Sequence, residues 1–420
     1  MRRVLRILLL AAGTLCCTTA DADTESLEVA VFPALDQIVN ATLPAWNAQH
    51  PDVKIKVLSR SYEDHHGAIL AALSSGEPQP DVIAVEIDYL RQFAESGGLE
   101  NLARLPYKGL LYRRNFVDYT FPLAASNKGE LIAMPVDIAP GTMFYRHDVM
   151  EKAGVSEADL AASWESYIEA GKKIKAATGA CLVSQASEVG NLVMRSGLKD
   201  GDGVYFDKNN KTQVEAPRFV KAFEVAKAVR DNGLDANIKR WTPEWLKGFQ
   251  RGTIATQMAG AWFGGYLANE IAPKTAGLWR VSDLPAGMFF DAGGTYYAIP
   301  KQSENKLMAW EFIKFMTLNK ATQLAAFKSQ NAFPALLEAQ VDPFFDQPVD
   351  FFGGQKVRML WRRAARRIPS ISISEYDHLA HDIVEEEMRK VLDEGKDIPS
   401  ALHDARTAIE RKIASEPHQP

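Results

Sequence analysis

Aromatic and charged residues follow the first two predicted strands of the chain, where a ligand could be held. Residues 27–32 and 53–57 have the apolar patterns of strands, and Phe32, Arg60 and Tyr62 come at or just after their carboxyl ends. An aromatic ring offers a flat apolar surface and a guanidinium offers fixed hydrogen-bond donors. These three residues are candidates by topology alone, because ligands of open α/β sheets bind beyond the carboxyl ends of the strands.

Other residue types that often do chemistry lack the partners they would need. Cys181 has no His partner that the sequence can place, so we interpret it as a buried small apolar residue. The stretch Asp200-Gly-Asp202-Gly has neither the glycine nor the acid that a calcium loop carries at its sixth and twelfth positions. The pair His65-His66 lacks further ligands and is expected near a helix start. We therefore predict no catalytic residue, no metal and no cofactor.

The elements that would position these residues alternate between strands and helices. A third strand is predicted over residues 81–85, and helices over 68–75 and 89–96 end at glycines. Strand–helix–strand connections favour parallel pairing through right-handed crossovers. A second α/β region is predicted after Ala139, and its helices are expected over 163–177, from Thr242-Pro243, from Ser303, and on both sides of Gly395.

Composition limits the classes of protein that are possible. The chain has 420 residues, of which 46% are hydrophobic and 24% charged, which excludes an intrinsically disordered chain. The length predicts two or three domains of about 100–200 residues. Lys and Arg number 48 against 53 Asp and Glu, so the net charge is −5 and no nucleic-acid partner is expected.

Residues 1–22 have the pattern of a cleaved signal peptide. Three arginines precede an apolar stretch over residues 7–17, and Ala20-Asp21-Ala22 offers small residues for cleavage. A lipid anchor is less favoured, because Cys16 and Cys17 follow Thr-Leu. Cleavage would remove three Arg and one Asp, leaving 45 basic and 52 acidic residues and a charge of −7. The expected location is the periplasm.

Several short segments, spread over most of the chain, resemble the extracellular solute-binding proteins (family 1) of carbohydrate ABC importers, the family that includes maltose-binding protein. They are residues 80–88 (PDVIAVEID), 131–137 (LIAMPVD), 143–148 (MFYRHD), Ser163-Trp164, 204–207 (VYFD), 249–252 (FQRG), 258–262 (MAGAW), Gly293-Gly294 and 309–315 (AWEFIKF). Each segment is weak by itself, and their shared order and spacing carry the resemblance. No particular sugar is identified by them.

The resemblance implies an α/β fold of the two-lobe periplasmic-binding-protein type (type II), in which each lobe is a β-sheet flanked by helices and the ligand cleft lies between the lobes. Residues 23–136 and 286–333 would form lobe 1, and residues 137–285 and 334–420 lobe 2. The chain would cross near 136–141, 283–287 and 333–337, where Pro135, Pro140-Gly141 and Pro285 fall. Ordinary surface turns would explain these prolines equally well.

The resemblance also implies ligand contacts. Asp88 would bind hydroxyl groups, or cap a helix, and Asp137 would make a polar contact at the first crossing, or form a turn. Trp262 would stack on a sugar face, or pack in the core, while Trp46, Trp164 and Trp310 are expected in the core. Gly294 and Thr295 would contact the ligand where the chain re-enters lobe 1. Tyr376 would be a cleft aromatic, and Glu375 replaces a tryptophan of maltose-binding members, which argues against maltose.

The implied function is capture of a small neutral carbohydrate by hinge closure and its delivery to transmembrane permease subunits, by a monomer without enzymatic activity. A binding protein for another solute, such as a glycerophosphodiester, a polyamine or iron, is the alternative. Tyr296-Tyr297 would suit iron, although adjacent strand residues point to opposite faces. A secreted glycoside hydrolase would need two carboxylates across a cleft, for which no motif is recognised.

Overall fold

A computed structural model describes residues 25–415, so the predicted signal peptide lies outside the described residues. Within that range the strands form one eight-stranded arrangement in the order β2-β1-β3-β7-β4-β5, and β6 and β8 also pair with β4. The strands are β1 (Glu25–Val31), β2 (Val53–Ser59), β3 (Val82–Glu86), β4 (Met134–Arg146), β5 (Thr256–Gly260), β6 (Trp279–Ser282), β7 (Asp291–Ala298) and β8 (Phe333–Pro334).

Helices fill the connections between these strands. Those before β5 are α1 (Leu35–Gln49), α2 (Tyr62–Ser75), α3 (Ile87–Glu95), α4 (Thr120–Leu123), α5 (His147–Ala153), α6 (Glu157–Ala161), α7 (Trp164–Thr178), α8 (Ala186–Val193), α9 (Pro217–Asp231) and α10 (Pro243–Arg251). Those after it are α11 (Trp262–Tyr266), α12 (Lys306–Leu318), α13 (Lys320–Gln330), α14 (Leu337–Gln340), α15 (Val357–Ala365), α16 (Asp377–Glu394) and α17 (Ile398–Ser415). Among the described residues no helix is both long and apolar enough to cross a bilayer.

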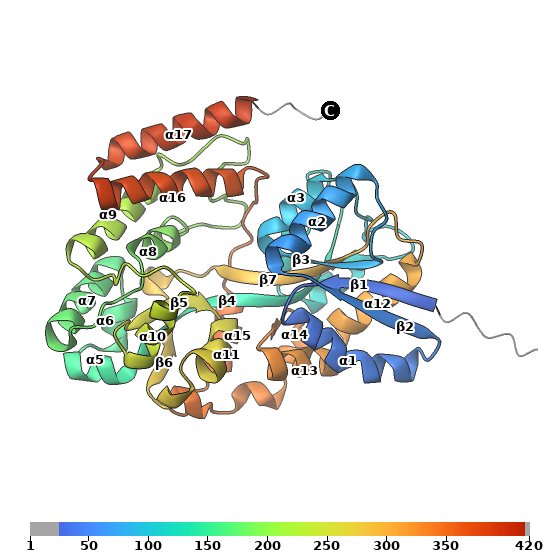
Figure 1. Cartoon of the computed structure of the whole chain (residues 1–420), viewed down its shortest axis with the longest axis horizontal. Helices are drawn as coiled ribbons and strands as arrows, with labels where there is room; N and C mark the ends of the chain where they lie inside the picture. Colours follow the sequence, from blue (N-terminus) through green and yellow to red (C-terminus); the bar gives the residue numbers. More distant parts are fainter. Residues whose placement is uncertain (1–24, 416–420) are drawn as a thin grey trace, which may run out of the picture.

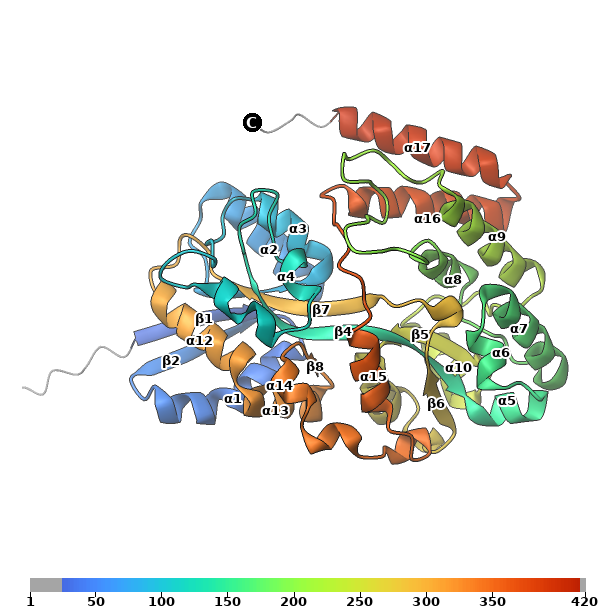
Figure 2. The ribbon, with the colours of Figure 1, turned by 180° about the vertical axis from the view of Figure 1, so that it is seen from behind.

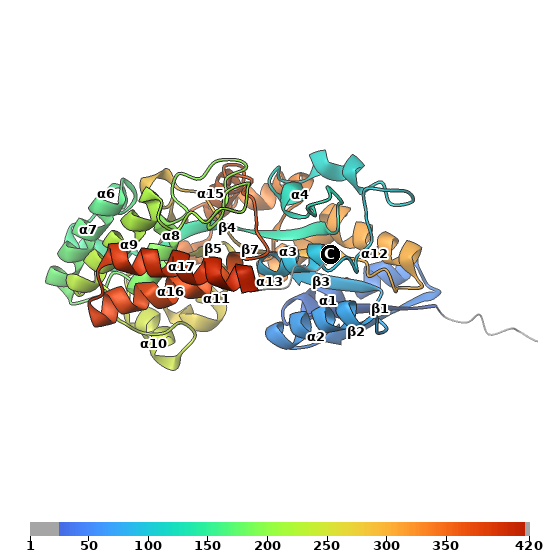
Figure 3. The same ribbon diagram turned by 90° about the horizontal axis from the view of Figure 1, so that it is seen from above.

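The elements gather in two bodies, with β4 and β7 side by side between them (Figure 1). The first body holds β1–β3, α1–α3 and α12–α14, and the second holds α5–α11, β5, β6, α16 and α17 (Figures 1 and 2). Seen from above, α16 and α17 lie side by side along the second body (Figure 3). Each body contributes apolar side chains to a large buried cluster, and Trp46, Trp164 and Trp310 are buried as predicted.

The strands of the first body pair as the sequence predicts. β1 lies parallel to both β2 and β3, since helices α1 and α2 carry the chain back to the same edge of the sheet. β7 comes much later in the sequence than β3 and β4, and it pairs antiparallel with both of them. The carboxyl ends of β1, β2 and β3 therefore lie near the beginning of β7, where the chain enters the first body from the second.

Strand β4 excludes the alternative that Pro135, Pro140 and Gly141 form ordinary surface turns. All three lie inside one strand of 13 residues. A proline cannot donate to a ladder, and the pairing of β4 with β7 shifts register between Pro135 and Asp137 and again between Ile138 and Pro140. Such irregularities accommodate proline in a strand, so the sequence signal marked bulges rather than turns.

Helix ends follow their predicted signals in most places. The Ser163 side chain accepts the Ser166 N–H, the Thr242 side chain accepts the Trp245 N–H, and Gly395 ends α16 in the left-handed region. The prediction that Ser303 begins a helix is wrong. Its hydroxyl instead donates to Asp81 Oδ1 at 2.7 Å, and α12 begins at Lys306. Cys181 is half-buried rather than fully buried.

Candidate ligand-binding site

Three adjoining cavities lie where the two bodies face each other, and Asp88 lines all of them. Their volumes are about 270, 370 and 730 Å³. Residues of both bodies line each cavity, because the carboxyl ends of β1–β3 face α8, α11 and α16 across the space. We call the three together the cleft. Sites of this size hold small molecules rather than macromolecules.

The first body presents aromatic rings that are fixed by contacts among themselves. Phe32 follows β1 and meets the ring of Tyr62, the first residue of α2, edge to face at 5.5 Å between centroids. Tyr62 in turn meets Tyr89 of α3 at 5.8 Å. Behind them, His66 stacks on Tyr89 at 4.1 Å, and burial lowers the pKa of His66 to about 4. A neutral imidazole therefore supports this aromatic face.

Carboxylates stand beside these rings at the start of α3. The backbone N–H of Asp88 donates to Glu86 Oε2 at 2.8 Å, and the Tyr62 hydroxyl donates to the same oxygen at 3.0 Å. Glu86 is thus the helix cap, which excludes the interpretation of Asp88 as the cap and leaves the Asp88 carboxylate in the cleft. Burial raises the pKa of Glu86, and the neighbouring Asp88 charge raises it further.

The second body presents larger and more exposed rings. Trp262 begins α11, and its indole lies 6.1 Å from that of Trp241 at an interplanar angle of 24°. Tyr266 lies one helical turn after Trp262 and contacts both indoles edge-on. The Trp262 Nε1–H donates to the Ala292 carbonyl at 3.1 Å, which ties this face to the beginning of β7.

Two guanidiniums complete the second body's side of the cleft. Arg195 follows α8 and lines two of the cavities. Arg240 lines two as well, its guanidinium lies 5.9 Å from the Trp241 ring, and its Nε is buried without a hydrogen-bond partner among the described residues. An unpartnered buried donor is costly, so a ligand acceptor that pairs with Arg240 would be favoured.

The strand between the bodies supplies the floor of the cleft. Gly293 and Gly294 have φ values of 124° and 141°, in the left-handed region that favours glycine. A Cβ at Gly294 would lie 2.9 Å from the Asp137 carbonyl oxygen, and one at Gly293 would lie 3.4 Å from Glu86 Oε1. Glycine therefore allows β7 to approach β4 closely and leaves room above the strand.

Asp291 joins the cleft to the strands that connect the bodies. Its Oδ1 accepts the Ala139 N–H of β4 at 2.8 Å, and its other oxygen is buried without a partner among the described residues. Burial raises the pKa of Asp291 to about 7. A carboxyl group at the junction of two bodies therefore changes charge near neutral pH.

The cavity of about 370 Å³ continues between α3 and the start of α16. Here the Tyr205 hydroxyl and His381 Nδ1 lie 2.9 Å apart, and both side chains face Asp88 and Arg195 across the cavity. Burial raises the pKa of Asp377, the first residue of α16, to about 6. This end of the cleft combines these polar groups with aliphatic side chains such as Ile87, Leu123 and Ile371. No group of three or more side chains that could hold a metal ion is found among residues 25–415.

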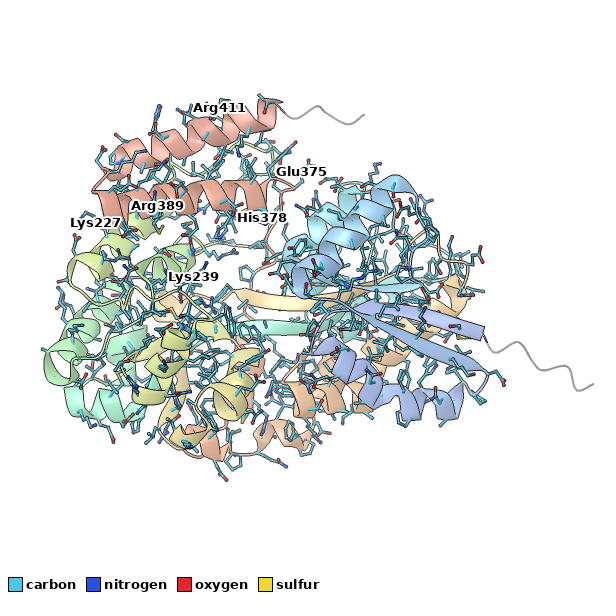
Figure 4. The ribbon with its side chains drawn as sticks, in the orientation of Figure 1. Lys227, Lys239, Glu375, His378, Arg389 and Arg411 are labelled. Atoms are coloured by element: carbon cyan, nitrogen blue, oxygen red, sulfur yellow. The ribbon has the colours of Figure 1, made fainter. Side chains whose placement is uncertain are left out.

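Six of the predicted contact residues come together in the cleft. They are Phe32, Tyr62, Asp88, Trp262, Gly294 and Thr295. Four others do not line it. Arg60 is exposed beyond β2, and Asp137 lies beneath Thr295, its partner in the β4–β7 ladder. Glu375 is exposed beside the start of α16 (Figure 4), and Tyr376 packs toward Phe206 at 6.2 Å.

Sequence reasoning missed several residues that line the cleft. These are Glu86, Tyr89, Glu188, Asn191, Arg195, Tyr205, Arg240, Trp241, Gln257, Tyr266, Asp291, Asp377 and His381. Two weak signals exist. An Arg-Trp pair directly before the helix start at Thr242 is unusual for a solvated loop, and Tyr266 falls four residues after Trp262, on the same helix face. No local signal marks Arg195 or Asp291.

A family profile described as "Bacterial extracellular solute-binding protein" matches residues 42–353. The chain belongs to this family. Its members are binding proteins, as the sequence predicts for this chain, and not enzymes. The family description names extracellular proteins, which agrees with the predicted export of this chain.

Two characterised relatives align over most of this member's length. The lactose-binding protein of Rhizobium radiobacter is 24% identical over 392 residues, which covers 89% of each chain. The arabinooligosaccharide-binding protein of Halalkalibacterium halodurans is 24% identical over 348 residues, covering 79% of this chain and 76% of the relative.

A solved structure of an extracellular solute-binding protein of family 1 has the same fold. It superposes with a TM-score of 0.82 at 22% identity, covering 93% of this chain and all of the other. At this identity the likeness concerns the fold alone. It confirms the predicted α/β periplasmic-binding-protein fold.

Proposed function

We propose that this solute-binding protein captures a neutral carbohydrate of one to three units and delivers it to the transmembrane subunits of an ABC importer. The observation that carries the proposal is the pairing of opposed aromatic faces with carboxylates in one cleft. Sugars present apolar C–H faces that stack on rings and hydroxyl groups that donate to carboxylates. Trp241, Trp262 and Tyr62 supply the rings, and Asp88 supplies an acceptor.

Capture would proceed by closure of two lobes over the ligand. Of the described residues, we assign 25–136 and 286–340 to one lobe and 137–285 and 341–415 to the other, so that β4 and β7 connect them. The boundary predicted at residue 333 moves to residue 340, because α14 packs on α13 of the first body. A ligand that contacts both sides favours the closed form by its difference in affinity for the two forms. The closed monomer would then present both lobes in one orientation to the permease.

The names of the relatives support the ligand class. The two relatives are described as binding lactose and arabino-oligosaccharides, which are neutral. Exposed indoles and tyrosines without a metal-binding group among residues 25–415 agree with such a ligand. We further propose that the chain acts in the periplasm after cleavage behind Ala22 and that the carbohydrate needs no cofactor.

A second candidate is an anionic solute such as a glycerophosphodiester. Arg195 and Arg240 favour it, because guanidiniums pair strongly with phosphate. Glu86, Asp88, Glu188 and Asp291 line the same cavity and would repel an anion. Iron is disfavoured, since Tyr296 and Tyr297 are both buried and neither lines the cleft.

Thermal unfolding of the mature chain against a panel of solutes tests the proposal. The panel contains lactose, maltose, arabinobiose, arabinotriose, glycerophosphocholine, spermidine and ferric citrate. A ligand at 100 times its dissociation constant adds about 2.7 kcal/mol to the free energy of unfolding, which is readily seen as a higher Tm. A shift with at least one neutral saccharide supports the proposal. Shifts confined to the charged solutes would overturn it.

A further inference from the structure

Three large apolar side chains project from one segment of the first body that does not line the cleft. Leu105, Leu110 and Leu111 are 75%, 52% and 74% exposed. They lie in residues 104–115, which we call the 104–115 segment, a turn followed by a 3-10 helix (Gly109–Asn115). Leu307, at the start of α12, is 63% exposed as well. Clustered exposed leucines on an exported protein mark an interaction surface.

The leucines are held outward by an ordered backbone. Tyr107 is buried and meets Trp310 of α12 edge to face at 5.7 Å, and Tyr112 contacts the same indole at 6.2 Å. Within the segment the Lys108 N–H donates to the Arg104 carbonyl at 2.9 Å and the Leu111 N–H to the Lys108 carbonyl at 3.0 Å. Because the tyrosines occupy the inner positions, the leucines between them face outward and have no place in the core.

Cations surround these leucines without partners. Arg104, Lys108, Arg113 and Arg114 are all exposed, and the 104–115 segment contains no acidic residue. None of the four forms an ion pair with a described residue, although Lys306 nearby pairs with Glu100 at 3.0 Å. The mature chain as a whole is predicted to carry a charge of −7, so this positive segment is a local exception.

Leucines ringed by unpaired Lys and Arg match the chemistry of an anionic bilayer surface. The cations are attracted to lipid phosphates, and the leucines enter the boundary between headgroups and acyl chains. An acidic protein surface would pair with the cations but would offer no hydrocarbon layer to the three exposed leucines. We propose that the 104–115 segment docks this protein on a bilayer that carries anionic phospholipids.

Such docking would hold the protein at the membrane by one body only. The segment precedes α4 and packs on α12, on the side seen in Figure 2, and none of its residues lines the cleft. The cleft would stay open to solvent while the protein is bound. The negative remainder of the chain would be repelled by the same lipids, which orients the protein with this segment toward the membrane.

Vesicle co-sedimentation of the mature chain, from residue 23 onward, tests the proposal. The vesicles are pure phosphatidylcholine or equal parts of phosphatidylcholine and phosphatidylglycerol. We expect binding to the mixed vesicles that weakens with added salt, and little binding to phosphatidylcholine. The variant R104Q/K108Q/R113Q/R114Q should bind about a hundredfold more weakly. The variant L105S/L110S/L111S should bind at least about a hundredfold more weakly, since burial of a leucine contributes about 1.5–3 kcal/mol.

A matched control separates the segment from net charge. The variant K173Q/K208Q/K247Q/K274Q removes four exposed lysines of the second body and changes the net charge by the same amount. It should bind the mixed vesicles as the parent does, or slightly more weakly. Thermal unfolding checks that each variant is folded. Equal losses in the control and the segment variants, or no preference of the parent for phosphatidylglycerol, would overturn the proposal. A segment that binds only an acidic protein would leave the vesicles unbound and overturn it as well.

Discussion

The two sides of the cleft differ in what they offer a ligand. The first body's side contains carboxylates and rings whose polar atoms are already engaged, as in the Tyr62 hydroxyl on Glu86. The second body's side contains two indoles, of which Trp241 is 54% exposed, and the guanidiniums of Arg195 and Arg240. Arg240 Nε is buried without a hydrogen-bond partner among residues 25–415. Both guanidiniums and both indoles therefore lie on the second body's side, whereas carboxylates line the cleft from both sides, Glu86 and Asp88 from the first body and Glu188 and Asp377 from the second.

This difference indicates how closure would depend on the ligand. A solute that offers only hydrogen-bond donors could pair with the carboxylates of the first body alone, and Arg240 would then have no acceptor to pair with. A solute with both apolar faces and hydroxyl groups would use both sides, and its binding free energy would favour the closed form. The following variants change one side at a time.

Removal of the stacking surface should have the largest effect. We expect Trp262→Ala to weaken binding of the best saccharide of the panel by a hundredfold or more, about 3 kcal/mol, because the aromatic surface is lost from the second body's side. Trp262→Phe keeps a flat ring and should lose less. Titration calorimetry gives both affinities. If Trp262→Ala binds as tightly as the parent, Trp262 does not stack on the ligand.

Neutralisation of the acceptor on the first body's side should come next. We expect Asp88→Asn to weaken saccharide binding by about 10- to 50-fold, since a charge-assisted hydrogen bond contributes about 1.5–3 kcal/mol. Asp118→Asn, an exposed aspartate outside the cleft, serves as the control and should bind like the parent. An unchanged affinity of Asp88→Asn would show that the acceptors lie elsewhere.

The junction between the bodies should make stability depend on pH. Burial raises the pKa of Asp291 from 3.8 to about 7, so the folded state binds a proton that the unfolded state releases between these values. The contribution of Asp291 to the free energy of unfolding should therefore fall by about 1 kcal/mol as pH rises from 5 to 6. Asp291→Asn can still accept the Ala139 N–H and should reduce this slope. Urea unfolding at each pH measures it, and an equal slope in both proteins contradicts the assignment.

Two arginines provide the smallest and most direct comparison. Arg240 lines the cleft, whereas Arg60 is exposed outside it. We expect Arg240→Ala to weaken saccharide binding by about tenfold, through the loss of a donor, and Arg60→Ala to change it by less than about twofold. Should both variants behave alike, the donors of the second body's side play no part in recognition.

The sequence predicted the elements better than it predicted the site. Strand–helix alternation in the first 100 residues, the caps at Ser163 and Thr242, and the three core tryptophans are all confirmed. Of the residues proposed for the cleft, those at the carboxyl ends of strands lie in it, with Arg60 as an exception. Arg60 comes directly after β2 but is exposed and does not line the cleft, which its place at the end of a strand does not predict.

Local sequence determined where this chain forms helices and strands, because periodicity, caps and glycines act over a few residues. The family resemblance of several short segments, and not these local patterns, indicated an α/β binding protein of two lobes. Only the tertiary structure decided which side chains share the cleft. Asp88, Arg195, Arg240, Asp291 and His381 are separated by tens to hundreds of residues and meet because β7 returns between β3 and β4. Long-range strand pairing of this kind, together with the bulges that admit Pro135 and Pro140, has no signature in any short stretch of sequence.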